Sequence, residues 1–121
     1  MSAKILIVDD SGFARRTLRR ILEEHGYRVE EAASGAEALE KYSDSKPDVV
    51  FLDLVMEGMQ GLELLHKLRE VDSDVKVVVA TADVQKLTRA EMLKAGASAL
   101  LNKPFKPEEV VGEVHRITGN R

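Results

Sequence analysis

Five side chains that could handle a divalent cation and a phosphoryl group follow or end short apolar runs, although they lie far apart in the sequence. They stand at the ends of the first, third, fourth and fifth such runs and are Asp9, Asp10, Asp53, Thr81 and Lys103. Three carboxylates brought close together repel one another, and Mg²⁺ relieves that repulsion economically because it prefers oxygen ligands. A lysine and a hydroxyl beside the metal would contact the oxygens of a phosphoryl group. Asp53 could then be the nucleophile, because carboxylates form acyl phosphates when a metal neutralises the transferring group.

Each of these residues also has an ordinary structural explanation. A pair of aspartates after a strand is usually a solvated turn or a helix cap, and Thr81 could be a strand-end cap. Lys103-Pro104 is commonly a turn, and a lone aspartate such as Asp53 at a strand end usually faces water. Their occurrence at successive strand ends favours one shared site, and that inference depends on the fold.

The apolar runs predict five strands that alternate with five helices. The strands are expected at residues 5–8, 28–32, 49–52, 75–80 and 98–101. This alternation of apolar strands with helices predicts an α/β fold with a five-stranded parallel sheet and helices on both faces. The second strand is the most polar and fits an edge, so the strand order 2-1-3-4-5 fits best. The carboxyl ends of parallel strands lie along one edge, where ligands bind at the switch point between the first and third strands.

The helix starts are marked by capping residues. Ser11 or Asp10 could cap the first helix, and Ser34 with Glu37 forms a capping box at the second. The fourth helix is expected to begin near residue 84, or at residue 88, where Thr88 and Glu91 could form another capping box. Pro107 suits the first turn of the last helix.

The composition indicates a single globular domain, expected over residues 1–121. The chain has 44 % hydrophobic and 32 % charged residues, a net charge of −3 and no cysteine. The absence of cysteine excludes disulfides and thiolate sites. The small net charge gives no indication of binding to nucleic acid or to a membrane surface. No apolar run is long enough to span a bilayer, and the N-terminus does not have the pattern of a signal peptide. We therefore expect a cytoplasmic protein.

The first predicted helix carries four arginines, which could suggest a nucleic-acid contact. However, Arg19–Glu23 and Arg20–Glu24 have the i,i+4 spacing of helical ion pairs, which favours a solvated face. The three histidines lie on different helices at no ligand spacing and are interpreted as surface residues: His25, His66 and His115.

In its acidic, hydroxyl and lysine motifs, the chain resembles a receiver domain of a two-component response regulator over essentially all of its residues. The motifs that carry the resemblance are Val8-Asp9-Asp10-Ser11, Leu52-Asp53 with Met56 and Gly61, Thr81-Ala82, and Lys103-Pro104-Phe105. The resemblance implies the flavodoxin-like fold of receivers. Chemotaxis proteins of this family have the strand order 2-1-3-4-5, so the resemblance also implies that order.

The resemblance also implies roles for individual residues. Asp53 would take a phosphoryl group from a histidine kinase or a histidine phosphotransfer domain. The Mg²⁺ ligands would be Asp10 directly, Asp9 through water, Asp53, and the backbone carbonyl of Val55. Lys103 would pair with the phosphoryl group and precede a cis peptide bond. Thr81 would move to contact that group and bias a surface formed by the last two helices and the fifth strand.

The resemblance implies signalling rather than turnover of an external metabolite. The protein would catalyse only its own phosphoryl transfer and dephosphorylation. The implied partners are a kinase or phosphotransfer domain, a downstream protein target and in some systems a phosphatase, with no direct contact to nucleic acid or membrane. A stand-alone receiver of the chemotaxis type is the leading expectation, and a piece of a longer regulator is the alternative.

Several positions depart from the pattern of the family. Glu57 stands where proline is usual, Gln60 replaces Asp or Asn, and Leu100 occupies a position where many members have an aromatic ring. Asp83 lies two residues after the threonine, where its charge would disfavour phosphate. These departures leave open a degenerate receiver that binds partners without phosphorylation. A flavin-binding or phosphohydrolase domain of the same fold is a third hypothesis, although Val55 stands where a hydrolase would have a second acid.

Overall fold

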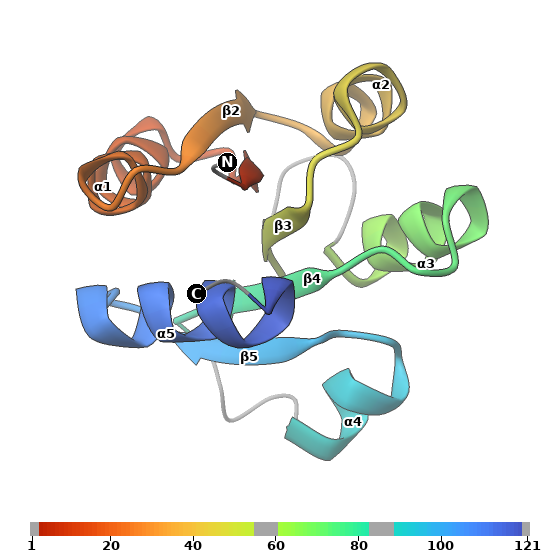
Figure 1. The fold of residues 1–121 in the computed structure, drawn as a ribbon. Coiled ribbons are helices and arrows are strands. Elements are labelled where there is room, and N and C mark those ends of the chain that lie inside the picture. Colours follow the sequence, from red (N-terminus) through yellow and green to blue (C-terminus); the bar gives the residue numbers. More distant parts are fainter. Residues whose placement is uncertain (1–2, 55–60, 83–88, 120–121) are drawn as a thin grey trace.

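The computed structural model describes residues 3–54, 61–82 and 89–119, which form an alternating α/β domain (Figure 1). The elements in chain order are β1 (Lys4–Val8), α1 (Gly12–Glu24), β2 (Arg28–Ala32), α2 (Gly35–Ser45), β3 (Val49–Asp53), α3 (Gly61–Val71), β4 (Val77–Thr81), α4 (Arg89–Lys94), β5 (Ala99–Asn102) and α5 (Pro107–Thr118). All neighbouring strands are parallel and follow the order β2-β1-β3-β4-β5. The predicted fold class, strand order and polar edge strand are therefore confirmed.

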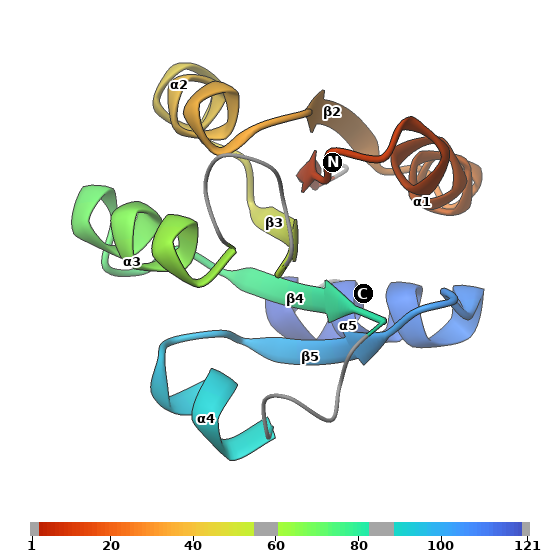
Figure 2. The ribbon, with the colours of Figure 1, turned by 180° about the vertical axis from the view of Figure 1, so that it is seen from behind.

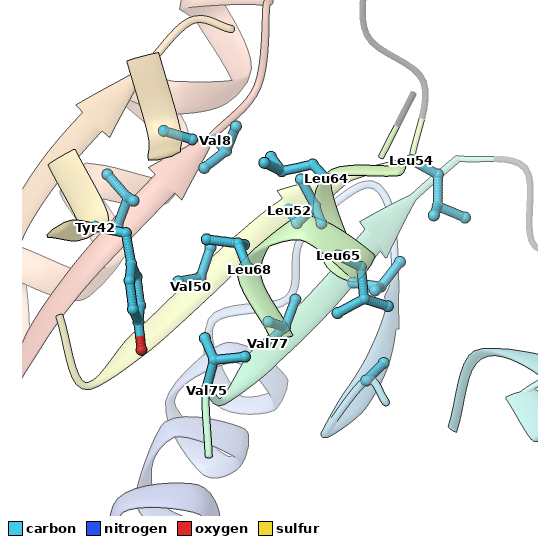
Figure 3. Packing of buried hydrophobic residues seen from close by; sticks show 14 of the residues in the cluster. Val8, Tyr42, Val50, Leu52, Leu54, Leu64, Leu65, Leu68, Val75 and Val77 are labelled. Atoms are coloured by element: carbon cyan, nitrogen blue, oxygen red, sulfur yellow. The ribbon is translucent and has the colours of Figure 1, made fainter. Parts of the chain in front are cut away.

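The helices cover both faces of the sheet, as the apolar strands require. Helices α1 and α5 lie on one face, and α2, α3 and α4 lie on the other (Figures 1 and 2). Each face has its own cluster of buried side chains. On the α3 face, leucines of the helix pack over valines and leucines of the strands (Figure 3). The helix leucines labelled there are Leu64, Leu65 and Leu68, and the labelled strand residues are Val8, Val50, Leu52 and Val77.

The ends of the helices follow the predicted capping chemistry, with one difference. The Ser11 hydroxyl accepts from the Ala14 amide at 3.2 Å and caps α1. The Ser34 hydroxyl accepts from the Glu37 amide at 3.2 Å, but the Glu37 carboxylate accepts from the Ala33 amide at 2.7 Å, one residue before the cap. The capping box is thus present, but the Glu37 side chain accepts from the amide of Ala33 instead of that of Ser34.

Four strands differ in their bounds from the sequence prediction. The first begins one residue earlier, at Lys4, and the third ends one residue later, at Asp53. The fourth strand begins at Val77 rather than at residue 75, although Val75 is buried. The Val75 amide instead donates to the Asp72 carbonyl in the turn after α3, so burial there does not reflect strand pairing. The fifth strand is shifted by one residue, because Ser98 precedes it and its amide donates to the Val77 carbonyl.

The described part of α4 begins at Arg89. Both predicted starts of this helix, near residue 84 and at residue 88, lie outside the described residues. Across the described ranges, no helix combines the length and the apolar character needed to cross a membrane.

Candidate functional site

The carboxyl edge of the sheet brings together side chains that the sequence separates widely. Asp9 directly follows β1, Asp53 is the last residue of β3, and Thr81 is the last residue of β4. Lys103 directly follows β5, and its amide donates to the Thr81 carbonyl at 3.0 Å. The parallel register places these strand ends side by side, with Asp53 opposite Ala80 and Thr81 opposite Asn102.

Three carboxylates form a compact cluster at this edge. One oxygen from each of Asp9, Asp10 and Asp53 lies within 4.8 Å of the others. Asp9 is buried, the Asp53 side chain is 13 % exposed and Asp10 is exposed, so the cluster opens from the interior toward solvent. An oxygen donor set of this kind, reachable by water, has the chemistry of a Mg²⁺ site, because Mg²⁺ binds through a few carboxylates and keeps several waters.

Lys103 provides the positive charge of the cluster. Its Nζ lies 2.7 Å from Asp9 Oδ2 and 3.4 Å from Asp53 Oδ2. Burial by itself lowers the pKa of Lys103, but the hydrogen bond to Asp9 and the charges of Asp53 and Asp9 outweigh burial and leave the pKa raised. The ammonium therefore stays charged at neutral pH and offsets one of the three negative charges.

The Asp9 side chain is held on both of its oxygens. The Ser11 amide donates to Oδ1 at 2.9 Å, while the Lys103 ammonium donates to Oδ2. A carboxylate that is only 4 % exposed requires such donors, because burial of an unpaired charge is costly. Asp9 is therefore fixed before any cation arrives.

Thr81 lies at the same edge but is 2 % exposed. The hydroxyl residue expected to contact a phosphoryl group is thus covered in this structure. The peptide bond Lys103-Pro104 is cis, as the resemblance implied. Leu100, at the position where many receivers have an aromatic ring, is buried in the core cluster on the α3 face.

Some of the expected site residues lie outside the described residues. They are Val55, which was expected to supply a backbone carbonyl to the metal, and the family-motif or departing positions Met56, Glu57, Gln60 and Asp83. The three histidines are all exposed, as expected.

Arg15 is a contact of the site that the sequence does not indicate, because its helix is predicted to present the arginines on a solvated face. Its Nη1 donates to the main-chain carbonyl of Asp9 at 2.6 Å, and its Nε lies 2.9 Å from Glu31. The predicted ion pair Arg19–Glu23 is present at 3.1 Å, but Arg19 also binds Glu31 at 2.6 Å. A glutamate in an edge strand beside an arginine-rich helix was the signal that could have indicated these contacts.

Comparisons with known proteins agree with this geometry. Residues 5–115 match the family model described as the response regulator receiver domain. The chain is 38 % identical over 119 residues to the chemotaxis protein CheY of Thermotoga maritima, covering 98 % of this chain and 99 % of that protein. It is 40 % identical over 117 residues to the response regulator MprA of Mycobacterium ulcerans, covering 97 % of this chain but only 50 % of that longer protein.

Solved structures show the same architecture. The chemotaxis protein CheY4 of Vibrio cholerae superposes with a TM-score of 0.89 at 33 % identity, covering 97 % of this chain and 99 % of that one. A CheX-CheY-BeF3-Mg²⁺ complex from Borrelia burgdorferi contains a chain with a TM-score of 0.90 at 30 % identity, covering 96 % of this chain and 89 % of that one. Because the family model spans most of the sequence and the Thermotoga protein matches it along nearly its whole length, this chain belongs to the response regulator receiver family of two-component signalling.

Proposed function

We propose that this chain is a phosphorylation-activated receiver in which Asp53 accepts a phosphoryl group from the phosphohistidine of a histidine kinase or a histidine phosphotransfer domain. The observation that carries the proposal is the position of Lys103, whose ammonium reaches both Asp9 and Asp53 at the carboxyl edge of the sheet. A cation at that place suits an anionic group arriving on Asp53.

The proposed transfer forms one bond and breaks one. An Asp53 carboxylate oxygen attacks phosphorus, an O–P bond forms, the N–P bond to the donor histidine breaks, and the imidazole leaves with a proton from solvent. Water later hydrolyses the acyl phosphate, which returns the carboxylate and inorganic phosphate. The chain thus acts only on its own phosphoryl group, and it has no external metabolite as substrate.

The three carboxylates would hold Mg²⁺, with the backbone carbonyl of Val55 as a further ligand. When bound, Mg²⁺ supplies positive charge to the phosphoryl oxygens and offsets the repulsion between them and the aspartates. The donor set of Asp9, Asp10 and Asp53 supports this assignment. The presence of Mg²⁺ and BeF3 in the complex of the Borrelia relative supports it further.

The output would be a change of surface rather than a released product. In the proposed switch, Thr81 turns toward the phosphoryl group and Lys103 pairs with it, which shifts the segment after β4 and biases the face formed by α4, β5 and α5. The readers of that face would be downstream proteins, with a receiver-binding protein comparable to CheX as a further partner. The likeness to several CheY proteins makes chemotaxis the leading candidate pathway.

The proposal is tested by intact-mass analysis after incubation with acetyl phosphate, with Mg²⁺ and with EDTA. We expect the wild-type protein to gain the mass of one HPO₃ group only with Mg²⁺. Asp53→Asn should gain none, because the amide is not a nucleophile of this kind. Asp44→Asn is the matched control, because Asp44 is an exposed aspartate on α2 away from the site, and it should behave as wild type.

Two outcomes would contradict the proposal. An adduct that still forms in Asp53→Asn would show that another residue is phosphorylated. The absence of any adduct, together with no perturbation by beryllofluoride, would indicate a receiver that binds partners without phosphorylation.

A further inference from the structure

Arg15 joins the acidic site to the edge of the sheet through its guanidinium group. On one side, Nη1 donates to the main-chain carbonyl of Asp9 at 2.6 Å. On the other side, Nε donates to the Glu31 carboxylate at 2.9 Å. The arginine side chain is 20 % exposed and that of Glu31 is 24 % exposed, so the pair is largely shielded from water.

The carbonyl that Arg15 contacts belongs to the peptide unit between Asp9 and Asp10. A peptide unit is planar, so a fixed carbonyl also fixes the orientation of the bond that leads to the next Cα. The Asp9 amide is already held by the Ala32 carbonyl at 3.1 Å. The hydrogen bond from Arg15 therefore sets how the exposed Asp10 carboxylate is presented relative to the buried Asp9 carboxylate.

Glu31 holds the guanidinium in this orientation. Its carboxylate accepts a hydrogen bond from Nε of Arg15 and another, at 2.6 Å, from Nη1 of Arg19 on the next turn of α1. Its pKa is lowered, first by the hydrogen bond from Arg19 and against the opposing effect of burial. The hydrogen bond from Nε to Glu31 by itself orients the planar fork of Arg15 toward the Asp9 carbonyl.

We propose that Arg15 is a positioning residue for the cation site, and that it raises Mg²⁺ affinity by fixing the peptide between Asp9 and Asp10. The inference rests on the proposed Mg²⁺-dependent function. In this role Arg15 would orient the residues that hold the cation, as hydrogen-bond partners of metal ligands commonly do. Arg15 does not touch the cation or the phosphoryl group in this assignment.

Charge and position predict opposite effects when Arg15 is replaced. Arg15 is a cation near three carboxylates, so loss of its charge alone would strengthen Mg²⁺ binding. Loss of its hydrogen bond would instead leave the Asp9–Asp10 peptide less constrained and weaken binding. Because loss of a positive charge would strengthen Mg²⁺ binding, a measured weakening of binding must come from the lost hydrogen bond.

The test is calorimetric titration of Mg²⁺ into metal-free full-length protein. Arg15→Gln should weaken Mg²⁺ binding about tenfold, the low end of the effect seen for partners of metal ligands. Arg15→Lys, which keeps one donor for the carbonyl but loses the fork, should lie between wild type and Arg15→Gln. It also serves as the second variant if Arg15→Gln is poorly folded in EDTA.

Two matched controls separate position from general effects on α1. Arg16→Gln removes an exposed neighbouring arginine that makes no hydrogen bond or ion pair among the described residues. Arg19→Gln removes the other partner of Glu31, and within the described contacts Arg19 does not reach Asp9. Both should bind Mg²⁺ with close to wild-type affinity, because neither change removes a hydrogen bond to the peptide between Asp9 and Asp10.

A kinetic measurement gives a readout that a purely structural role would not produce. The Mg²⁺ concentration for half-maximal phosphorylation by acetyl phosphate should rise in Arg15→Gln by the same factor as the dissociation constant. The rate at saturating Mg²⁺ should change little, because Arg15 does not contact the reacting atoms.

The outcomes distinguish this inference from the proposed function. Equal or tighter Mg²⁺ binding in Arg15→Gln, with normal binding by the wild type, would overturn the inference alone. Equal weakening in Arg15→Gln and Arg19→Gln would also overturn it, because the Glu31 pair rather than the Asp9 carbonyl would then be responsible. No Mg²⁺ binding by the wild type would remove the proposed function and this inference together.

Discussion

Asp9 shows how a charge can remain at the end of a buried strand. It is 4 % exposed, yet the Ser11 amide and the Lys103 ammonium donate to its two oxygens. These donors replace the water that the carboxylate loses on folding. Lys103 offsets only one negative charge, so the cluster with Asp10 and Asp53 keeps an excess of negative charge that favours a cation.

Gly61 is the residue at which the backbone after β3 leaves no room for a side chain. A Cβ atom there would contact the Asp53 carbonyl oxygen and lie 2.6 Å from Leu54 Cα. These are main-chain atoms, which cannot move aside without shifting the chain at Asp53. Gly61→Ala should therefore lower the free energy of unfolding by about 1–3 kcal/mol, as overpacking does. It should also slow phosphorylation of Asp53.

The measurement is urea unfolding together with the rate of adduct formation from acetyl phosphate. Gly112→Ala is the control, because Gly112 lies in the interior of α5 and an added Cβ would meet no atom within 4 Å other than the nearby backbone of its own helix. Alanine there should stabilise the protein by about 0.5–1 kcal/mol through its helix propensity. Equal behaviour of the two variants would show that the contact between Gly61 and the main chain is relieved without cost.

At the scale of elements, α2 and α3 are joined by a hydrogen bond that neither helix could specify alone. The Tyr42 hydroxyl, from α2, donates to Asp72 Oδ2 at 2.8 Å, just after the end of α3. The tyrosine ring is buried in the cluster on this face of the sheet, and Figure 3 shows it beside Val50. Burial, followed by the hydrogen bond to Asp72, raises the pKa of the Tyr42 hydroxyl above its usual 10.0.

Tyr42→Phe should lower the free energy of unfolding at neutral pH by about 1 kcal/mol, the usual net value of one hydrogen bond. The raised pKa means that the unfolded chain loses this proton more readily than the folded protein. The contribution of Tyr42 is therefore fully present below pH 10.0 and is lost as the pH rises above it. Urea unfolding of both proteins from neutral to alkaline pH checks this, and a constant difference across that range would contradict it.

At the scale of the whole molecule, the carboxylate cluster proposed to hold Mg²⁺ forms only in the folded state. Its carboxylates come from the ends of β1 and β3, and Lys103 follows β5, so the unfolded chain does not bring them together. Anything that binds the folded state alone stabilises it by mass action. Cation binding and global stability should therefore be linked.

Mg²⁺ at a hundredfold excess over its dissociation constant should raise the free energy of unfolding by about 2.7 kcal/mol relative to EDTA. Asp10→Asn, which removes one ligand, should show a much smaller rise, whereas Asp44→Asn on the exposed face of α2 should keep it. Urea midpoints in Mg²⁺ and in EDTA measure the effect. A full rise in Asp10→Asn would place the bound cation elsewhere.

The sequence by itself determined most of the elements, because these depend on local patterns, and the strand order followed from the polar second strand together with the resemblance to receivers. Apolar runs, capping residues and a polar second strand are readable without coordinates, and the structure follows them closely. The prediction fails where a buried residue does not pair with a neighbouring strand. Val75 is such a residue, because it is buried in a turn rather than in the strand. Periodicity reports burial, and it cannot distinguish these two situations.

The candidate site was predictable only because topology is a strong constraint. Once the strands are parallel and ordered 2-1-3-4-5, residues at their carboxyl ends must meet, so Asp9, Asp53, Thr81 and Lys103 could be assigned to one edge. The sequence could not indicate that Lys103 binds Asp9 more closely than Asp53, or that Thr81 is covered. Those features depend on side-chain placement between elements.

Tertiary structure alone decided the role of α1 beside the site. The spacing of its arginines suggested pairing within the helix, yet Arg15 reaches a main-chain carbonyl after β1 and a glutamate of β2. A main-chain carbonyl has no sequence signature, and the reach of an arginine to it is set by how the helix packs on the sheet. The residue pattern therefore defined the chemistry at the carboxyl edge, and the packing of α1 on the sheet placed Arg15 against the Asp9 carbonyl.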